Sequence, residues 1–280
     1  IADHYYKATG IRESISNRGI DKNSLNLLGR IDWNITGKHK MALRYQYNDA
    51  YKDKYDTKST GYYFPNSTYR QNSKTNSVVL ELNSNFSQNV YNEFRSGLTF
   101  VRDKRDVKYL APNVQISGAG GDFDVTANVW NPGKIGVSIG TEASSGANAV
   151  DVDAYTFEDN LSIYKGNHSI TFGTHNEVFK SYNLFIQHCT GTYLYNSTQD
   201  FLDDNAYRFQ YNYSDPALTG STRWAGTTKS GQFGFYAQDK WNAGRNLTLT
   251  YGLRLDIPVS FNSPTENPEF NASDYAKTHD

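Results

Sequence analysis

The sequence predicts an all-β chain whose antiparallel strands form part of the wall of a transmembrane β-barrel. Three observations predict this fold. Apolar and polar residues alternate over stretches of about ten residues. These stretches come in pairs joined by short turns, and long connections separate the pairs. A tilted strand needs about 9–11 residues to cross the hydrocarbon layer, so the stretches have the length of membrane-spanning strands.

The first hairpin shows the alternation most clearly. From Leu25 to Ile35 the odd positions are apolar or glycine, while Arg30 and Asp32 lie between them. In a strand these two sets point to opposite faces, so one face is apolar and the other charged. After a turn at residues 36–38 the alternation resumes from Met41 to Asn48. The two stretches therefore predict a β-hairpin.

Three more hairpins follow with the same organisation, which brings the prediction to eight strands in four hairpins. Their paired strands are Thr75–Phe86 with Val90–Arg102, Tyr155–Tyr164 with Ser169–Lys180, and Gln232–Trp241 with Leu247–Ile257.

Long connections separate the hairpins at residues 50–74, 103–153 and 181–231. They are rich in Gly, Asn, Ser, Asp and Tyr, and a compact soluble domain rarely repeats loops of this length. Transmembrane barrels have short turns on the periplasmic side and long loops outside the cell. We therefore expect barrel strands and loops over residues 24–257, an extracellular loop remnant at 1–23, and the start of the next extracellular loop at 258–280.

The composition agrees with a sheet that has one apolar and one polar face. Hydrophobic residues make up only 37% of the chain, yet 15% of residues are aromatic, including 22 Tyr. Disordered chains are poor in aromatics, so disorder does not explain the low hydrophobic share. The net charge of −1 gives no sign of nucleic-acid binding. The outer membrane of a Gram-negative bacterium is the expected location.

Other targeting and redox signals are few. No apolar stretch is long enough for a transmembrane helix. The chain does not begin with a charged segment followed by an apolar run, so we expect no signal peptide within it. The single Cys189 excludes an intramolecular disulfide and a cysteine-cluster metal site.

Aromatic residues lie beside the short turns, which predicts a periplasmic aromatic girdle at headgroup depth. The girdle residues are Trp33, Phe86, Tyr164 and Trp241. The alternative is that these rings are ordinary β-formers that pack at hairpin ends.

The charged positions of the polar face are the candidates for lining the lumen. They are Arg30, Asp32, Arg44, Glu93, Arg95, Arg254 and Asp256, together with Glu158 and Glu177. The alternative role, which we favour for most of them, is to form cross-strand charge pairs that hydrate the wall or hold a plug.

Two loops carry candidate ligand-contacting aromatics, because Tyr offers a large contact area at low entropic cost. These residues are Tyr62, Tyr63, Tyr193 and Tyr195. The alternation of Tyr207, Phe209, Tyr211 and Tyr213 equally suggests that the loop extends the barrel strands as a short hairpin.

No catalytic or metal site is expected. His168 and His175 are an odd number of residues apart in one strand, so they lie on opposite faces. His188 beside Cys189 is the one soft-ligand pair, and no further ligands lie near it in sequence. We find no nucleophile elbow or phosphate-binding loop, and we expect no cofactor and no enzymatic activity.

Several segments together resemble a known family. Residues 234–241 (GFYAQDKW) followed by 246–258 (NLTLTYGLRLDIP) resemble the barrel of TonB-dependent outer-membrane receptors. Residues 166–173 (GNHSITFG), 36–45 (TGKHKMALRY) and 83–87 (NSNFS) are similar to the same barrels. The resemblance covers most of residues 24–258 and is strongest to the Oar-like group, which carries a carboxypeptidase-regulatory-like N-terminal domain.

The resemblance implies a barrel of about 22 strands that is plugged by an N-terminal domain. It also implies outer-membrane lipid as surroundings, a TonB complex that acts through the plug, and uptake of a substrate whose identity is unknown. This sequence has no plug and no TonB-box motif, so we expect it to be a fragment from the middle of such a barrel. Eight strands that close on themselves are the alternative arrangement.

Two other functions remain open at this point. A passive outer-membrane porin or adhesin would need neither plug nor TonB. A soluble secreted β-protein would need a second layer to cover the apolar faces, and the sequence offers none.

Overall fold

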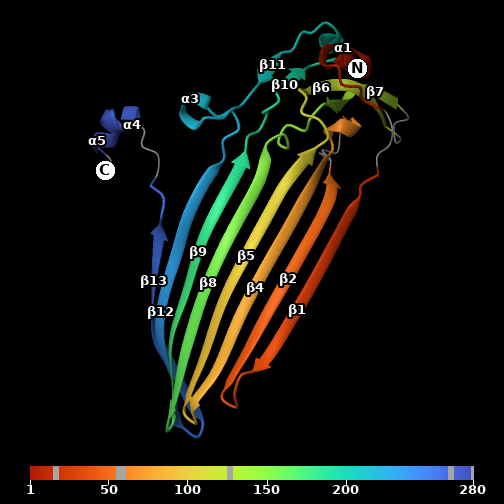
Figure 1. The fold of residues 1–280 in the computed structure, drawn as a ribbon. Helices are drawn as coiled ribbons and strands as arrows, with labels where there is room; N and C mark the ends of the chain where they lie inside the picture. Colours follow the sequence, from red (N-terminus) through yellow and green to blue (C-terminus); the bar gives the residue numbers. More distant parts are fainter. Residues whose placement is uncertain (15–18, 55–60, 125–128, 264–267, 279–280) are drawn as a thin grey trace.

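The chain folds into two sheets, a large one and a small one (Figure 1). The computed structural model describes residues 1–14, 19–54, 61–124, 129–263 and 268–278. None of the helices within these ranges is long and apolar enough to cross a membrane.

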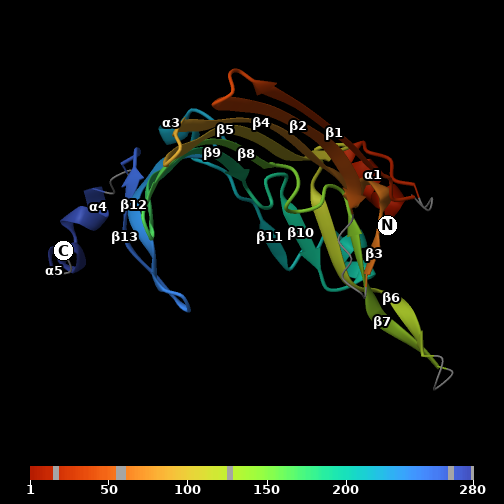
Figure 2. The same ribbon diagram turned by 90° about the horizontal axis from the view of Figure 1, so that it is seen from below.

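The large sheet contains eight antiparallel strands in the order β1-β2-β4-β5-β8-β9-β12-β13. Their bounds are β1 Lys22–Asn34, β2 His39–Lys54, β4 Tyr69–Ser87, β5 Val90–Val107, β8 Asn148–Lys165, β9 His168–Phe185, β12 Gly226–Gly244 and β13 Leu247–Ser260. The sheet is strongly curved and forms an open arch (Figure 2). Each strand pairs with its predecessor in this order, so the predicted hairpins are all present.

The strands are longer than the sequence predicts, mainly at the end away from the short turns. For example, β5 continues to Val107 and β9 to Phe185. The extra residues are largely polar, and the alternation that predicts strands fades there. Pairing continues because each backbone still finds hydrogen-bond partners on its neighbours, as in the pair Tyr69 and Val107.

Short turns close the four hairpins at one end of the large sheet (Figure 1). Gly166 has a φ of 59°, which the first central position of a two-residue hairpin turn requires. Backbone hydrogen bonds connect neighbouring hairpins beside the turns, including one of 2.8 Å from Asn242 N to Asn167 O. The turns therefore form one continuous rim.

The two faces of the large sheet differ as the alternation predicts. Side chains such as Leu253, Ile31 and Phe172 project from one face, where Leu253 is 85% exposed and Ile31 68% exposed. No other described element covers this apolar face. The opposite, polar face carries the charged residues described below.

The sheet remains open, because β1 pairs only with β2 and β13 pairs only with β12 among the described strands. Its eight strands therefore do not close into a small barrel. The unpaired edges leave rows of N–H and C=O groups that require a partner in hydrocarbon.

The long connections are not the irregular loops that their composition suggests, because they form the small sheet in the order β11-β10-β6-β7-β3. Its strands are β3 Gly61–Tyr63, β6 Asn113–Asp124, β7 Val129–Ile139, β10 Thr192–Tyr195 and β11 Arg208–Gln210. Two of the pairings, β10 with β6 and β3 with β7, are parallel. The small sheet lies at the end of the large sheet opposite the short turns (Figure 1).

Short helices complete the chain. They are α1 Ala2–Thr9, η1 Pro65–Ser67, α2 Thr198–Leu202, α3 Pro216–Thr219, α4 Pro268–Ala272 and α5 Asp274–Thr278. A buried cluster joins α1, the small sheet and α2 through Tyr5, Ile116, Ile139 and Phe201. The main apolar core therefore lies in the loop layer, which we define as α1, η1, α2 and the small sheet, and not in the large sheet.

Candidate functional site on the polar face

One row of directly paired residues crosses the polar face of all eight strands. Antiparallel pairing places opposite residues side by side on the same face. In strand order the row reads Asp32, Ala42, Glu81, Arg95, Glu158, His175, Gly234 and Asp256. Six of these eight positions carry a titratable side chain, so the register of the hairpins assembles a charged band from residues far apart in sequence.

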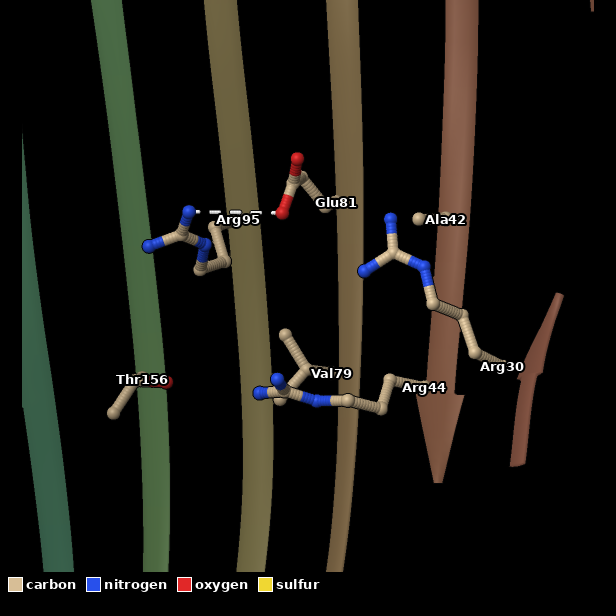
Figure 3. Close-up of a pocket in the computed structure, with 7 residues that line it drawn as sticks. All are labelled: Arg30, Ala42, Arg44, Val79, Glu81, Arg95 and Thr156. Atoms are coloured by element: carbon tan, nitrogen blue, oxygen red, sulfur yellow. Dashed lines mark ion pairs between the residues drawn. The ribbon is translucent and has the colours of Figure 1, made fainter. Parts of the chain in front are cut away.

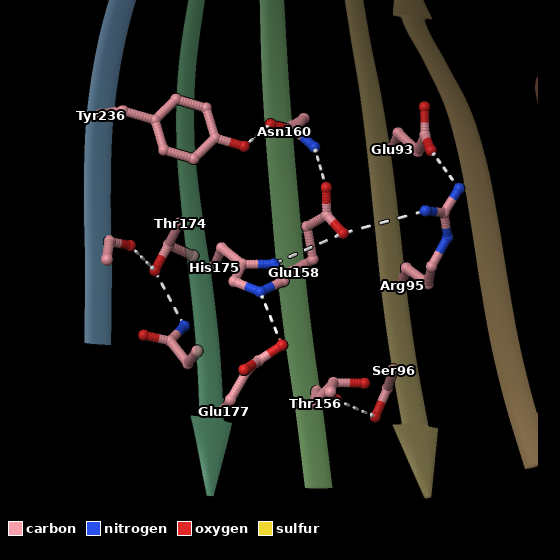
Figure 4. A network of polar contacts seen from close by, with 12 residues as sticks. Glu93, Arg95, Ser96, Thr156, Glu158, Asn160, Thr174, His175, Glu177 and Tyr236 are labelled. Atoms are coloured by element: carbon pink, nitrogen blue, oxygen red, sulfur yellow. Dashed lines mark hydrogen bonds and ion pairs between the residues drawn. The ribbon is translucent and has the colours of Figure 1, made fainter. Parts of the chain in front are cut away.

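Arg95 is the centre of this row, and three carboxylates surround it. Its Nη2 lies 2.9 Å from Glu93 Oε1, and its Nη1 lies 3.8 Å from Glu158 Oε2 (Figure 4). The same Nη2 lies 3.6 Å from Glu81 Oε2 (Figure 3). The three carboxylates come from strands β4, β5 and β8. A single guanidinium therefore lies among carboxylates from three neighbouring strands.

The network continues from Glu158 toward β9 and β12. His175 lies between two carboxylates, with Nδ1 3.7 Å from Glu158 Oε2 and Nε2 3.0 Å from Glu177 Oε1 (Figure 4). Asn160 donates to Glu158 Oε1 at 3.1 Å and accepts a hydrogen bond from the Tyr236 hydroxyl. Five strands, β4, β5, β8, β9 and β12, thus share one polar network.

Beside this network a cavity of about 290 Å³ opens on the polar face (Figure 3). It is lined by Arg30, Ala42, Arg44, Val79, Glu81, Arg95 and Thr156. The small side chain of Ala42 leaves room between the longer side chains of its neighbours.

Positive charge exceeds negative charge in this cavity, which we call the arginine pocket. Arg30 pairs with Asp32 at 2.8 Å, and Arg95 shares its carboxylates as described. Arg44 has no hydrogen bond or ion pair with any residue that the structure describes. A guanidinium without a carboxylate partner is suited to bind an oxyanion in a bidentate way.

The structure places all seven predicted lumen residues on the same face of the sheet. It brings Arg30, Arg44 and Arg95 together at the arginine pocket, whereas Arg254 and Asp256 pair with each other at 2.8 Å on the edge strand β13. Glu81 and His175 lie on this face as well, although neither was among the predicted lumen residues. Glu81 alternates with Leu80 and Leu82 in a predicted strand, so the period-two pattern contained the signal for it.

The predicted girdle residues divide between the two faces. Trp33, Phe86 and Trp241 lie near the short turns with 57%, 55% and 36% exposure. Trp33 and Trp241 alternate with polar-face residues and so project from the apolar face. Tyr164 pairs with Ser169 on the polar face, because it alternates with Ile163 and Lys165. Tyr164 is therefore at girdle depth but not on the girdle face, which corrects the prediction for this residue.

The candidate loop aromatics lie in the small sheet. Tyr62 is 40% exposed and packs edge-on against Phe64, and Tyr193 packs against Phe209 with ring centroids 4.6 Å apart. Tyr63, at the end of β3, is partly buried. Tyr195 is only 6% exposed and belongs to the buried core, and its burial raises the pKa of its hydroxyl. Tyr195 therefore has little surface for a ligand.

The alternating aromatics from Tyr207 to Tyr213 do not extend the barrel strands, because β11 pairs with β10 in the small sheet. The rings of Phe209, Tyr211 and Tyr213 instead stack in series, with the Tyr211 and Tyr213 centroids 5.4 Å apart. A cavity of about 300 Å³ lies nearby between α1 and β10, lined in part by Tyr5, Tyr193 and Phe201.

His188 and Cys189, the soft-ligand pair of the loop, pack against neighbouring residues and are not arranged to bind a metal. The His188 ring bonds Thr192 Oγ1 at 2.8 Å, and burial lowers the pKa of His188. Cys189 is buried, which raises the pKa of its thiol. Across the described part of the chain, no three His, Cys, Asp or Glu side chains are grouped to hold a metal ion.

Comparisons with known proteins find similarity to outer-membrane β-barrels. A family model described as "Outer membrane beta barrel domain" matches residues 6–277. Among solved structures, the outer membrane transporter YddB from Escherichia coli is similar with a TM-score of 0.54 and 15% identity, over 85% of this chain and 28% of that chain. No curated protein matches in sequence.

The ferric-catecholate import receptor Fiu from Escherichia coli is similar in two forms. Its closed form has a TM-score of 0.52 at 12% identity, over 88% of this chain and 35% of that chain. Its open form has a TM-score of 0.51 at 13% identity, over 88% of this chain and 38% of that chain. This chain therefore spans about a third of the length of these structures, and the likeness concerns the fold.

Proposed function

This chain belongs to the outer membrane beta barrel domain family, and we propose that it forms part of the wall of a TonB-dependent receptor that takes up a substrate actively. Its location is the outer membrane of a Gram-negative bacterium, and its surroundings there are lipid. The Oar-like group is the proposed subfamily, on the segments 234–241 and 246–258. The proposal includes no catalytic step.

The observation that carries the proposal is the division of the large sheet into a lipid-compatible face and a charged face. On β13 the apolar face runs from Leu247 to Ile257 without a charged residue. Ten steps of about 3.4 Å span about 34 Å along the strand, and a tilt of about 45° projects this to about 24 Å. That height is close to the ~25 Å apolar band of outer-membrane barrels.

Two acidic residues interrupt the apolar face within this band, Asp239 on β12, whose carboxylate bonds to His168 and Tyr251, and Asp159 on β8. The Asp159 carboxylate accepts a hydrogen bond of 2.8 Å from Asn92 Nδ2 on β5. An ionisable group facing hydrocarbon is costly, and such a local amide partner lowers that cost. The band is therefore continuous enough to face lipid.

With the apolar face in lipid, the polar face turns inward and lines the barrel interior. We assign the row through Arg95 to that interior, where a plug domain or a passing substrate meets it. The arginine pocket offers either of them a site for an anionic group, since Arg44 lacks a partner within the described structure.

Capture by TonB tests this proposal against a passive porin or adhesin. The native protein, solubilised from outer membranes, is applied to immobilised periplasmic domain of the host's TonB, with a passive porin from the same membranes as control. We expect the native protein to be retained and the control to flow through. Equal recovery of the two proteins would contradict TonB dependence.

Conductance in planar bilayers separates the same two functions independently. A receptor whose interior is occupied by a plug gives no steady conductance, whereas a passive porin forms an open channel. We expect no steady conductance across the bilayer after insertion of the native protein. A stable open conductance would favour the porin.

A further inference from the structure

A groove of about 750 Å³ lies at the short-turn rim between the β8–β9 turn and β12. It is lined by Lys165, Gly166, Asn167, His168, Ile170, Asp239 and Trp241. The strand residues among them alternate with polar-face residues, so they belong to the apolar face. In the membrane this groove lies on the lipid side of the barrel, at the short-turn end of the apolar band where the hydrocarbon meets the headgroups.

The imidazole of His168 is held in one orientation within the groove. Its Nδ1 lies 2.6 Å from Asp239 Oδ2, and the same oxygen accepts a 2.8 Å hydrogen bond from the Tyr251 hydroxyl. The ring also stacks on the Trp241 ring, with centroids 5.6 Å apart and planes 5° apart. With Nδ1 engaged, Nε2 on the other side of the ring is the nitrogen left to bind a ligand.

Lys165 supplies a positive charge beside this ring. It is the direct cross-strand neighbour of His168, so their side chains start about 5 Å apart on one face. Lys165 has no carboxylate partner among the residues described, whereas Asp239 is engaged by His168 and Tyr251. The groove therefore presents one unpaired cation and one oriented ring nitrogen toward the headgroup region.

A second hollow, of about 540 Å³, follows further along the same strands. Its apolar-face lining is Phe172, Phe235, Ala237, Leu253 and Leu255. Ala237 lies directly between Phe172 and Leu253 in the register, so its small side chain leaves a furrow between larger ones. The furrow begins one residue pair beyond Ile170 and Asp239, which places it on the hydrocarbon side of the first groove.

We propose that the two hollows form a binding site for one membrane phospholipid. Lys165 Nζ donates a charge-assisted hydrogen bond to an oxygen of the lipid phosphate, and His168 Nε2 donates a second one when the ring carries a proton on both nitrogens. Trp241 and Ile170 contact the glycerol region, and one acyl chain lies in the furrow over Ala237. The proposal rests on the barrel orientation described above and adds a lipid ligand to its outer surface.

The chemistry favours a lipid phosphate over free phosphate. A free anion would use the Lys165 and His168 end only and would leave Trp241 and the furrow uncovered. A diacyl phospholipid fills both hollows, because its phosphate lies at the boundary between headgroups and chains.

Native mass spectrometry of the full chain, released from bilayer discs, tests the proposal. The discs contain equal amounts of phosphatidylglycerol and monogalactosyldiacylglycerol with identical acyl chains, so the two lipids differ in the phosphate. We expect the protein to retain phosphatidylglycerol about tenfold over the galactolipid, as expected for charge-assisted hydrogen bonds.

Three variants locate the binding site. Lys165→Gln should reduce the preference to about twofold or less, whereas Lys38→Gln, which changes the exposed turn lysine of the first hairpin, should leave it intact. Ala237→Phe fills the furrow and should lower the retention of both lipids without changing their ratio. Equal retention of the two lipids by the wild-type chain, or an unchanged ratio in Lys165→Gln, would overturn the proposal.

Competition with inorganic phosphate distinguishes a lipid phosphate from free phosphate as the ligand. Inorganic phosphate at millimolar concentration should not displace the retained phospholipid, and displacement would mean that the site binds free phosphate instead. If the chain inserted into discs but showed no lipid preference, the lipid site would be refuted and the proposed function would be unaffected. The TonB capture experiment reports on the proposed function separately.

Discussion

Arg95 shows how single residues organise the polar face. Its guanidinium has carboxylates on three strands within 4 Å, yet the side chain is 43% exposed. Each pair alone is worth little, because water screens exposed charges. The larger effect is the mutual repulsion of Glu81, Glu93 and Glu158, which the single cation offsets.

Replacement of Arg95 tests this balance. We expect Arg95→Gln to lower the free energy of unfolding by about 1–2 kcal/mol at low ionic strength, because three carboxylates then face one another without a cation. Lys104→Gln, which removes one exposed pair with Asp106, should cost about 0.5 kcal/mol or less. The measurement is urea unfolding in detergent at two salt concentrations. Equal losses for the two variants would show that the cluster has no special effect.

Gly173 provides a second prediction at this scale. A Cβ at this position would overlap the Tyr236 ring, which lies across the glycine and whose hydroxyl donates to Asn160 Oδ1. Gly173→Ala should displace the ring and cost about 1–3 kcal/mol. Gly29→Ala is the matched strand control, since nothing lies within 4 Å of its Cβ. If both variants unfolded at the wild-type urea concentration, the packing of Tyr236 on Gly173 would have no energetic weight.

Among the elements, the large sheet was predictable from sequence and the small sheet was not. Each long strand has several repeats of apolar and polar alternation, and its hairpin partner lies next to it in sequence. The local pattern therefore determines which residues lie on each face. The small sheet uses strands as short as Gly61–Tyr63, and β10 pairs in parallel with β6 across the whole β7–β9 segment. Three residues carry no measurable period, and a non-local parallel pairing leaves no turn signal.

The candidate site divides in the same way. Alternation placed the charged residues from Arg30 to Asp256 on one face, because a strand has only two faces. The arginine pocket depends in addition on which strands are neighbours and on the small side chain of Ala42. The burial of Tyr195 depends on the loop layer, so a tyrosine that the sequence suggests as a ligand contact is a core residue.

A buried acid that packs against the loop layer makes the stability of this layer depend on pH. Glu13 is 7% exposed and accepts a hydrogen bond of 3.3 Å from Asn66 N. Burial raises the pKa of Glu13. A carboxyl group whose folded pKa lies above its unfolded pKa binds its proton more tightly when folded. Its contribution therefore favours folding at low pH and is lost as pH rises through the folded pKa.

Glu13→Gln should remove this dependence. We expect the variant to raise the melting temperature of the loop layer by about 2–4 °C at neutral pH and above, and to have little effect below pH ~4. Asp3→Asn, at an exposed position of α1, should show no such pH-dependent gain. Thermal unfolding followed by circular dichroism across this pH range measures the difference. A parallel shift of wild type and Glu13→Gln with pH would contradict the role of Glu13.

On the scale of the whole molecule, the placement of apolar surface is inverted relative to a water-soluble protein. Large apolar side chains of the large sheet are exposed, while the buried core lies in the loop layer at one end of that sheet. Such a surface is stable only where lipid replaces water. The open edges at β1 and β13 carry the same implication, since they need further strands to complete the wall.

Two leucines of equal exposure distinguish lipid-facing from water-facing surface. Leu253 on β13 and Leu218 on α3 are both 85% exposed. Leu253→Arg should lower the free energy of folding into a bilayer by about 2–4 kcal/mol, because the charge enters the apolar band. Leu218→Arg should change it by less than about 0.5 kcal/mol. Similar small effects at both positions would place Leu253 in water.

The dependence of folding on detergent tests the central claim most directly. The purified chain is refolded with and without detergent micelles or liposomes, and its circular dichroism and the heat-dependent mobility of its band on a gel are recorded. We predict a folded β-signal only when micelles or liposomes are present, because the apolar face needs a lipid-like surface. A monomeric species that folds cooperatively in plain buffer would contradict the membrane assignment.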